Sequence, residues 1–169
     1  MHLDALVGLI DGENGKSCSL PGGKEVVRHR GRLWIEDRAE PVSYRLPIAP
    51  GEIEIPGTPW RVSVEQISAE TIKIHKFTTE NRQIFSLPPA KIKTAYLRPM
   101  QTGDQIFTRG AHHAVRRLYR EAGIAPGERL SRPMLCTNAE LLWIPGIAAR
   151  DGIGRDPKEG NWLLSFHKK

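Results

Sequence analysis

The hydrophobic positions of the first segment follow a helical period. Within residues 2–11 the apolar side chains recur every three or four positions, and Gly12 follows as a natural stop. These apolar positions are Leu3, Leu6, Val7 and Ile10. A helix of about ten residues is marginal unless another element packs on its apolar stripe. We therefore predict a short amphipathic helix and interpret residues 1–14 as a helix left from a preceding helical domain.

Between residues 20 and 87 the pattern changes to short runs of alternating apolar and polar residues. The alternation, as in Ile53 and Ile55, is the period-two signature of half-buried strands. Turn residues separate the runs, and the prolines at 88–89 cannot donate to a strand ladder, so they mark a boundary. We predict a β-rich linker module over residues 15–88. Its expected strands occupy residues 25–27, 32–35, 51–55, 60–64, 71–77 and 83–87.

The third segment, residues 89–169, combines strands with one interior helix. A helical wheel over residues 112–122 puts Val115, Leu118 and Ala122 on one side. The opposite side carries Arg116, Arg117 and Arg120, so one side is expected to pack and the other to be cationic. Expected strands occupy residues 91–97, 134–137, 140–144 and 161–167. Together the segments predict an α+β, β-rich fold of small antiparallel sheets or barrel-like modules with one basic helix and a short N-terminal helix.

Composition is typical of a soluble globular protein. Of the 169 residues, 39% are hydrophobic and 26% are charged, and the mean hydropathy is −0.40, which argues against a disordered chain and against a membrane protein. The two cysteines, Cys18 and Cys136, form no CxxC pair, and no basic-then-apolar signal segment opens the sequence. A disulfide scaffold and a secreted protein are therefore disfavoured, and a cytoplasmic location is expected.

Positive charge is concentrated in one segment. Residues 91–132 carry nine basic and three acidic side chains, so their net charge of +6 equals that of the whole chain. Seven of the nine bases are arginines, whose planar fork suits phosphate oxygens. A polyanion is the first partner to consider, and a solvated basic surface without a ligand is the alternative.

Motifs of common catalytic and nucleotide-binding sites are missing. The GKS run at positions 15–17 imitates the end of a Walker A loop, but Ile10 stands where that motif needs a glycine. No GxSxG, HExxH or GxGxxG occurs. The adjacent His112 and His113 would point about 100° apart on a helix, so joint metal ligation would need distant groups such as Cys136, which is expected in the core. We expect no catalytic residue, metal or cofactor in this chain.

An ordered series of short motifs in the second half resembles one bacterial enzyme family. The series is LRP at 97–99, GD at 103–104, VRRLY at 115–119, Arg129 four residues before Pro133, and LLWIPGI at 141–147. It is similar to the C-terminal domain of bacterial tRNA(Ile)-lysidine synthetase, which is itself similar to a domain of the phenylalanyl-tRNA synthetase β chain. Residues 20–87 resemble the stretch before that domain, so the resemblance covers nearly the whole chain. It assigns residues 89–169 to a C-terminal tRNA-binding domain.

The resemblance implies a tRNA-modifying ligase that uses ATP and Mg²⁺ to attach lysine to the wobble cytidine of the CAU-anticodon isoleucine tRNA. In that family the reaction belongs to an N-terminal PP-loop domain with an S-G-G-x-D-S loop, which this sequence lacks. The double glycine at 22–23 has neither the preceding Ser nor the following Asp-Ser. By itself the chain is expected to dock tRNA(Ile) and not to form lysidine.

Charge and resemblance together give the candidate tRNA-binding residues. Arg116, Arg117 and Arg120 are expected to follow one RNA backbone, because A-form RNA is read mainly through its shape, phosphates and 2′-hydroxyls. The remaining candidates are Lys91, Lys93, Arg98, Arg109, Arg129 and Arg132. Alternatively, Arg98 and Arg129 pair with Asp104 and Glu128 to hold loops.

Two other functions are open from the sequence. The chain could be the interaction half of a split synthetase that docks through Leu3, Leu6 and Ile10 onto a separate PP-loop ATPase subunit. It could also be a stand-alone general RNA-binding module. The resemblance further implies a homodimer.

Overall fold

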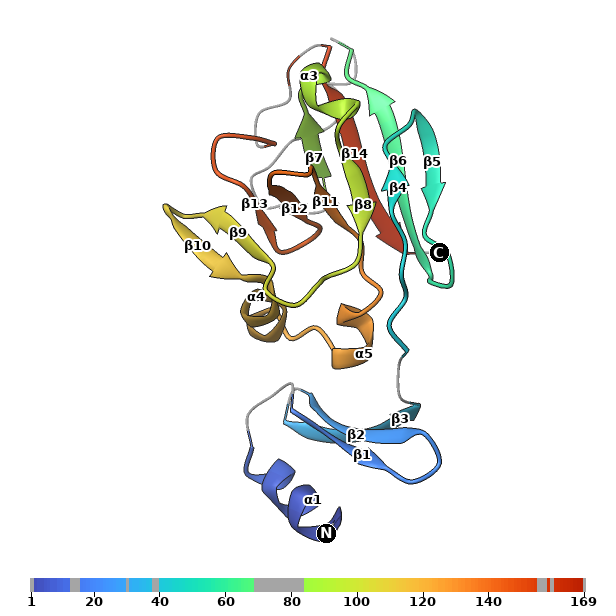
Figure 1. Ribbon diagram of the computed structural model, residues 1–169, viewed down its shortest axis with the longest axis vertical. Helices are drawn as coiled ribbons and strands as arrows, with labels where there is room; N and C mark the ends of the chain where they lie inside the picture. The colour runs from blue at the N-terminus through green and yellow to red at the C-terminus, as the bar shows by residue number, and fades with distance from the viewer. Residues whose placement is uncertain are drawn as a thin grey trace.

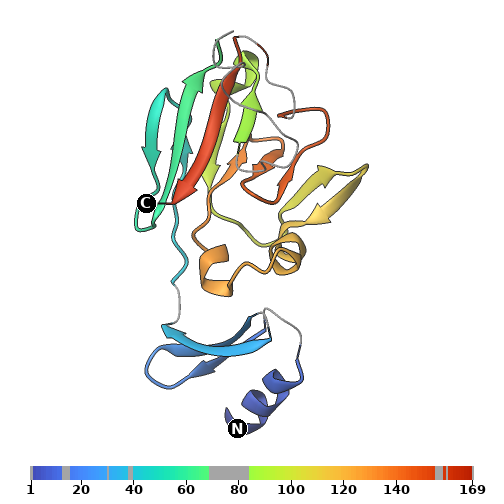
Figure 2. The same cartoon turned by 180° about the vertical axis from the view of Figure 1, so that it is seen from behind.

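Two parts make up the chain, a small N-terminal unit and a larger body (Figures 1 and 2). The structure is a computed structural model that describes residues 2–12, 16–29, 31–37, 40–68, 84–154, 158 and 160–168. The strand expected at residues 71–77 lies outside this range. Among the described helices, none has the length and apolar character needed to span a bilayer.

The N-terminal unit is a helix on a three-stranded antiparallel sheet in the order β1-β2-β3. The helix α1 covers His2–Ile10, and the strands are Ser17–Leu20, Lys24–His29 and Arg32–Asp37. On β2, Arg28 donates to the carbonyl oxygen of Leu9 at 3.0 Å and also to that of Ile10, and so satisfies carbonyls at the end of α1.

The predicted N-terminal helix is confirmed, but the prediction of its packing side is wrong. Among the side chains of α1 that the structure describes, Leu9 is buried, whereas Val7 and Ile10 remain more than half exposed. Arg28 holds the helix end against β2, and this attachment fixes which side of the helix faces the sheet.

Two antiparallel sheets form the larger body. The four-stranded sheet has the order β5-β6-β14-β7 and the five-stranded sheet the order β13-β12-β11-β8-β4. The strands of the first are Gly51–Glu54, Trp60–Gln66, Trp162–Lys168 and Ile84–Leu87. Those of the second are Ala148–Ala149, Leu141–Ile144, Met134–Cys136, Tyr96–Arg98 and Leu46–Pro47.

Both sheets take strands from before and after position 88, because β14 lies between β6 and β7 and β4 pairs with β8. Position 88 therefore does not separate two hydrophobic cores. The division of the chain into residues 1–14, 15–88 and 89–169 stays a prediction.

The first hydrophobic core joins the two sheets. Trp60 stacks on Phe166 with ring centroids 4.8 Å apart, and Phe85 stacks on Trp143 at 5.4 Å. Along β6 the buried side chains alternate with partly exposed ones, as the period-two pattern predicts.

A second core lies on the other side of the five-stranded sheet. The alternation of β11 directs Leu135 into the first core, whereas Met134 and Cys136 belong to the second. There they pack with Val115 and Tyr119 of α4 (Val115–Glu121), both of which are fully buried.

The interior helix begins later than the sequence predicts, at Val115 instead of residue 112. Residues 111–114 form β10, which pairs with β9 (Gln105–Thr108). Arg109 and Gly110 both have positive φ, at 56° and 76°, as a two-residue hairpin turn requires. The hairpin therefore removes His112 and His113 from the helix.

The prediction of a strand at residues 91–97 is also wrong for the first half of that range. There α3 (Pro89–Ile92) begins with a proline, whose fixed φ and missing N–H suit the first turn of a helix. After α3 the chain turns back toward β8, and the N–H of Ala95 donates to the carbonyl oxygen of Lys91 at 2.9 Å. A second short helix, α5 (Pro126–Arg129), was not predicted. The predicted fold class, β-rich α+β with small antiparallel sheets, is confirmed.

Candidate nucleic-acid interface

The helix α4 is buried on one side and cationic on the other. Val115, Leu118 and Tyr119 are buried in the second core. Arg116 and Arg120 are exposed on the opposite side, and Arg117 lies beside them with 64% of its side chain exposed. The predicted separation of the two sides is confirmed, although the third packing residue is Tyr119 and not Ala122, which is exposed.

One of these arginines has an acidic partner on its own helix. The Nε atom of Arg117 donates to Glu121 at 2.6 Å, one helical turn away, and this hydrogen bond lowers the pKa of the Glu121 carboxyl. Exposed pairs of this kind contribute little to stability. Arg117 therefore remains available to an anion that competes with Glu121.

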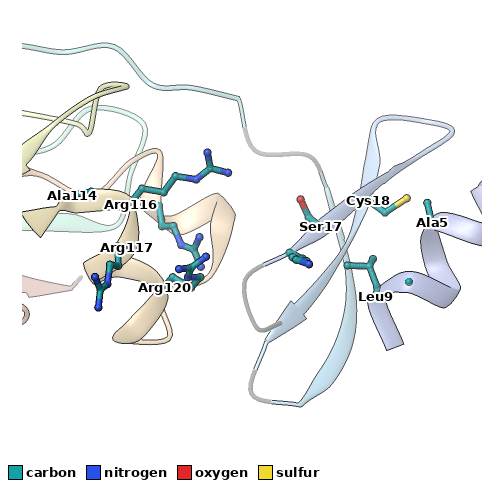
Figure 3. Close-up of a pocket in the computed structure, with 11 residues that line it drawn as sticks. Ala5, Leu9, Ser17, Cys18, Ala114, Arg116, Arg117 and Arg120 are labelled. Atoms are coloured by element: carbon teal, nitrogen blue, oxygen red, sulfur yellow. The ribbon is translucent and has the colours of Figure 1, made fainter. Parts of the chain in front are cut away.

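A cleft of about 750 Å³ separates α4 from the N-terminal unit. Arg116, Arg117, Arg120 and Arg129 line one wall, and α1 and β1 form the other with residues that include Lys16, Ser17 and Cys18. In Figure 3, Arg116 extends from α4 toward the strand that carries Ser17 and Cys18. Among the described residues that line the cleft, none is Asp or Glu.

The sequence did not predict Lys16 as part of this site. In the sequence, Lys16 belongs to a run that only imitates a Walker A loop, and it lies in a segment whose net charge is not positive. Its place depends on how the N-terminal unit meets α4, a contact between residues about one hundred positions apart, and no local pattern reports that.

Two of the predicted residues form ion pairs inside the larger body. Arg98 donates to both carboxylate oxygens of Asp104, at 2.7 and 2.8 Å, and this hydrogen bond raises the pKa of the Arg98 guanidinium. Arg132 pairs with Glu128 and donates to the carbonyl oxygen of Pro145 at 3.0 Å. The expected loop-holding pair of Arg98 is therefore confirmed.

The predicted partner of Arg129 is wrong, because Arg132 and not Arg129 takes Glu128. The guanidinium of Arg132 also lies over the ring of Trp60, 4.9 Å from its centroid. Arg132 follows Glu128 by four positions, a spacing that brings the two side chains together. Arg129 instead donates from Nε to the carbonyl oxygen of Ile124 at 2.6 Å.

The other three candidates lie away from the cleft. Lys91 forms an ion pair with Glu140 at 2.7 Å, and Lys93 is exposed at the end of α3. Arg109 is exposed in the turn between β9 and β10. The structure therefore brings Arg116, Arg117, Arg120 and Arg129 together and leaves these three apart.

Cys136 is a buried residue of the second core and not a reactive thiol. Cys136 is 1% exposed, and burial raises the pKa of its thiol to about 12, so the thiol is protonated at neutral pH. His112 and His113 lie on β10 opposite Phe107 and Ile106, so the expectation that they open the basic helix is wrong. The described residues contain no group of three His, Cys, Asp or Glu side chains that could hold a metal ion.

The fold and the site define a β-rich α+β domain with an arginine-lined helix surface. Residues 96–166 match the family model of the TilS substrate C-terminal domain. The chain is 24% identical over 164 residues to the tRNA(Ile)-lysidine synthase of Solibacter usitatus (strain Ellin6076), a match that covers 94% of this chain and 37% of the relative. Residues 96–166 are thus a TilS C-terminal domain, and the chain is distantly homologous to tRNA(Ile)-lysidine synthase.

The fold agrees with a solved structure. A crystal structure of a TilS C-terminal domain superposes with a TM-score of 0.60 and 16% identity, covering 75% of this chain and 98% of that one. At this identity the likeness concerns the fold alone. The chain spans little more than a third of the length of the synthase that it matches.

Proposed function

We propose that this chain docks tRNA(Ile) for a lysidine-forming ligase, using the arginine side of α4 as the contact surface. One observation carries the proposal: Arg116, Arg117 and Arg120 leave one side of a helix whose other side is fully buried. Packing of the buried side holds the helix in place, and the positions of the three arginines on α4 are fixed with it. The names of the matching domain and synthase refer to a substrate and to tRNA(Ile), and they support the same partner.

The physical basis is recognition of RNA shape and charge. Arginine suits this role because its fixed fork can hold two phosphate oxygens at once. A-form RNA hides its base edges in a deep, narrow groove, so a rigid surface contacts its phosphates and 2′-hydroxyls. A cytoplasmic place of action follows from the tRNA partner.

We assign no bond-forming step to this chain. The sequence lacks the S-G-G-x-D-S loop, so we propose no site for ATP or Mg²⁺ in this chain. The ligase activity, with its need for ATP and Mg²⁺, is proposed for a PP-loop domain or subunit that acts with this chain.

Salt dependence tests the docking mode. If the α4 surface and its neighbours neutralise about five phosphates, the logarithm of the association constant should fall with the logarithm of salt concentration at a slope of roughly −4 to −5. Fluorescence anisotropy with isoleucine tRNA at several salt concentrations measures the slope. Arg116→Ala should make the slope less steep by about one. A slope near zero would contradict docking through phosphate contacts.

A second candidate function has its own observation. Consecutive residues Leu33, Trp34 and Ile35 of β3 are between 41% and 68% exposed, and Val7 and Ile10 of α1 are more than half exposed. Leu33 and Ile35 share one face of β3, because alternate residues of a strand point to the same side, and exposed apolar side chains on one surface often mark a protein contact. They support the interaction half of a split synthetase, with a PP-loop ATPase subunit as the partner.

Co-purification with such a subunit tests this candidate. Leu33→Ser and Ile35→Ser together should abolish the complex, whereas alanine at Arg116, Arg117 and Arg120 should leave it intact. Retention of the complex by the β3 variant would overturn the assignment of this surface.

A further inference from the structure

The arginines buried in the larger body differ in one respect. Arg132 is 7% exposed and has Glu128 as its partner, and the side chain of Arg98 is 16% exposed and has Asp104. Arg129 is also only 7% exposed. Over the part of the chain that the structure describes, no carboxylate contacts Arg129. Its charge is therefore left without the compensation that the other two receive.

Positive charge surrounds Arg129. Arg116 and Arg120 lie close enough that their charges, after burial itself, lower the pKa of Arg129. A buried guanidinium between like charges is costly unless an anion offsets it. Arg129 lines the cleft, and Lys16 adds a cation from the opposite wall. The buried guanidinium of Arg129, which no carboxylate of the described residues contacts, thus faces a space where an anion can enter.

The size of the cleft favours a strand end over a duplex. About 750 Å³ lies within the range of pockets that enclose a small ligand. The space is bounded by α4 on one side and by α1 and β1 on the other (Figure 3), and Arg129 lines it beside α4. One or two nucleotides at the end of a strand fit a volume of this size.

We propose that this cleft binds the 5′-terminal phosphate of an RNA strand, held by Arg129 with Arg116 and Arg120 beside it. The proposal rests on the docking function above and specifies which part of the RNA enters the cleft. A phosphate monoester carries about 1.5 to 2 negative charges at neutral pH and three terminal oxygens. An internal phosphodiester carries a single charge, so a site with three guanidinium groups matches the terminal phosphate better.

Two forms of one tRNA test the proposal. Isoleucine tRNA with a 5′-monophosphate is compared with the same tRNA after removal of that phosphate, by fluorescence anisotropy at fixed salt and pH 7.5. The phosphorylated form should bind about tenfold more tightly, because it adds charge-assisted hydrogen bonds. The ratio should shrink below about pH 6, where the monoester gains a proton.

Variants locate the effect in the cleft. Arg129→Lys, which keeps a charge and loses the planar fork, and Arg116→Ala should each bring the ratio close to one. Arg116 is exposed, so its variant carries the test if Arg129→Lys fails to fold. Lys93→Ala is the matched control, because Lys93 is exposed and lies away from the cleft, and it should leave the ratio near ten.

The two proposals fail in different ways. Tight binding of both tRNA forms with equal affinity would overturn the terminal-phosphate site and leave tRNA docking intact. Loss of the preference in Lys93→Ala but not in Arg129→Lys or Arg116→Ala would also overturn the site. Absence of binding by either form would overturn the docking function itself.

Discussion

Asp104→Ala is expected to lower the free energy of unfolding by about 3 kcal/mol. The side chains of Arg98 and Asp104 are only 16% and 13% exposed, so alanine would leave the guanidinium with little solvent and no counter-charge. The Asp104 carboxylate also accepts from the backbone N–H of Gln101 at 2.7 Å, which fixes the turn that leads into β9. Urea denaturation followed by circular dichroism measures the loss.

Glu121→Ala is the matched control for this prediction. It removes the acidic partner of Arg117, but both side chains of that pair are at least half exposed, so the expected loss is below about 0.5 kcal/mol. A double change of Arg98→Met and Asp104→Leu should recover part of the stability, because no buried charge is left unpaired. Equal losses in the Asp104 and Glu121 variants would contradict a structural role for the Arg98 pair.

The two-sided helix and the strands could be predicted because their signals are local. The buried residues Val115 and Leu118 stand three positions apart, which is the spacing of one helix side. In β6, Trp60, Val62 and Val64 are buried in alternation, as the period of two implies.

The β9–β10 hairpin was missed because its turn carries a weak signal. Arg109 adopts a positive φ that bulky residues rarely take, and an Arg-Gly pair is not among the dipeptides that announce a two-residue hairpin. Residues 111–114 pair with β9 and form a strand, although the sequence pattern places residues 112–114 in the helix. A tertiary contact thus decides what a helical wheel cannot.

The composition of the cleft depended on tertiary contacts in the same way. The basic segment supplied the right helix, but charge alone could not separate arginines that hold loops from arginines that face a ligand. Arg98 and Arg132 fall in the first group because carboxylates happen to lie within reach. Arg129 joins the cleft with Lys16 only through the meeting of α4 with the N-terminal unit.

Replacing Arg116, Arg117 and Arg120 together by alanine is expected to weaken binding of isoleucine tRNA about hundredfold or more, since each lost phosphate contact is worth close to tenfold. The three side chains are exposed on α4, so the fold should be retained. Dissociation constants from anisotropy at one fixed salt concentration measure the effect, and circular dichroism checks the fold.

The charge-matched comparison is the most direct test that RNA lies on the arginine side of α4. A control variant with Arg61→Ala, Lys158→Ala and Lys168→Ala also loses three positive charges, but from residues outside the cleft. The ratio of the dissociation constants of the two triple variants for isoleucine tRNA, measured side by side at one salt concentration, is the decisive quantity. We predict that the α4 triple binds at least about thirtyfold more weakly than the control, and equal affinities of the two would contradict the assignment.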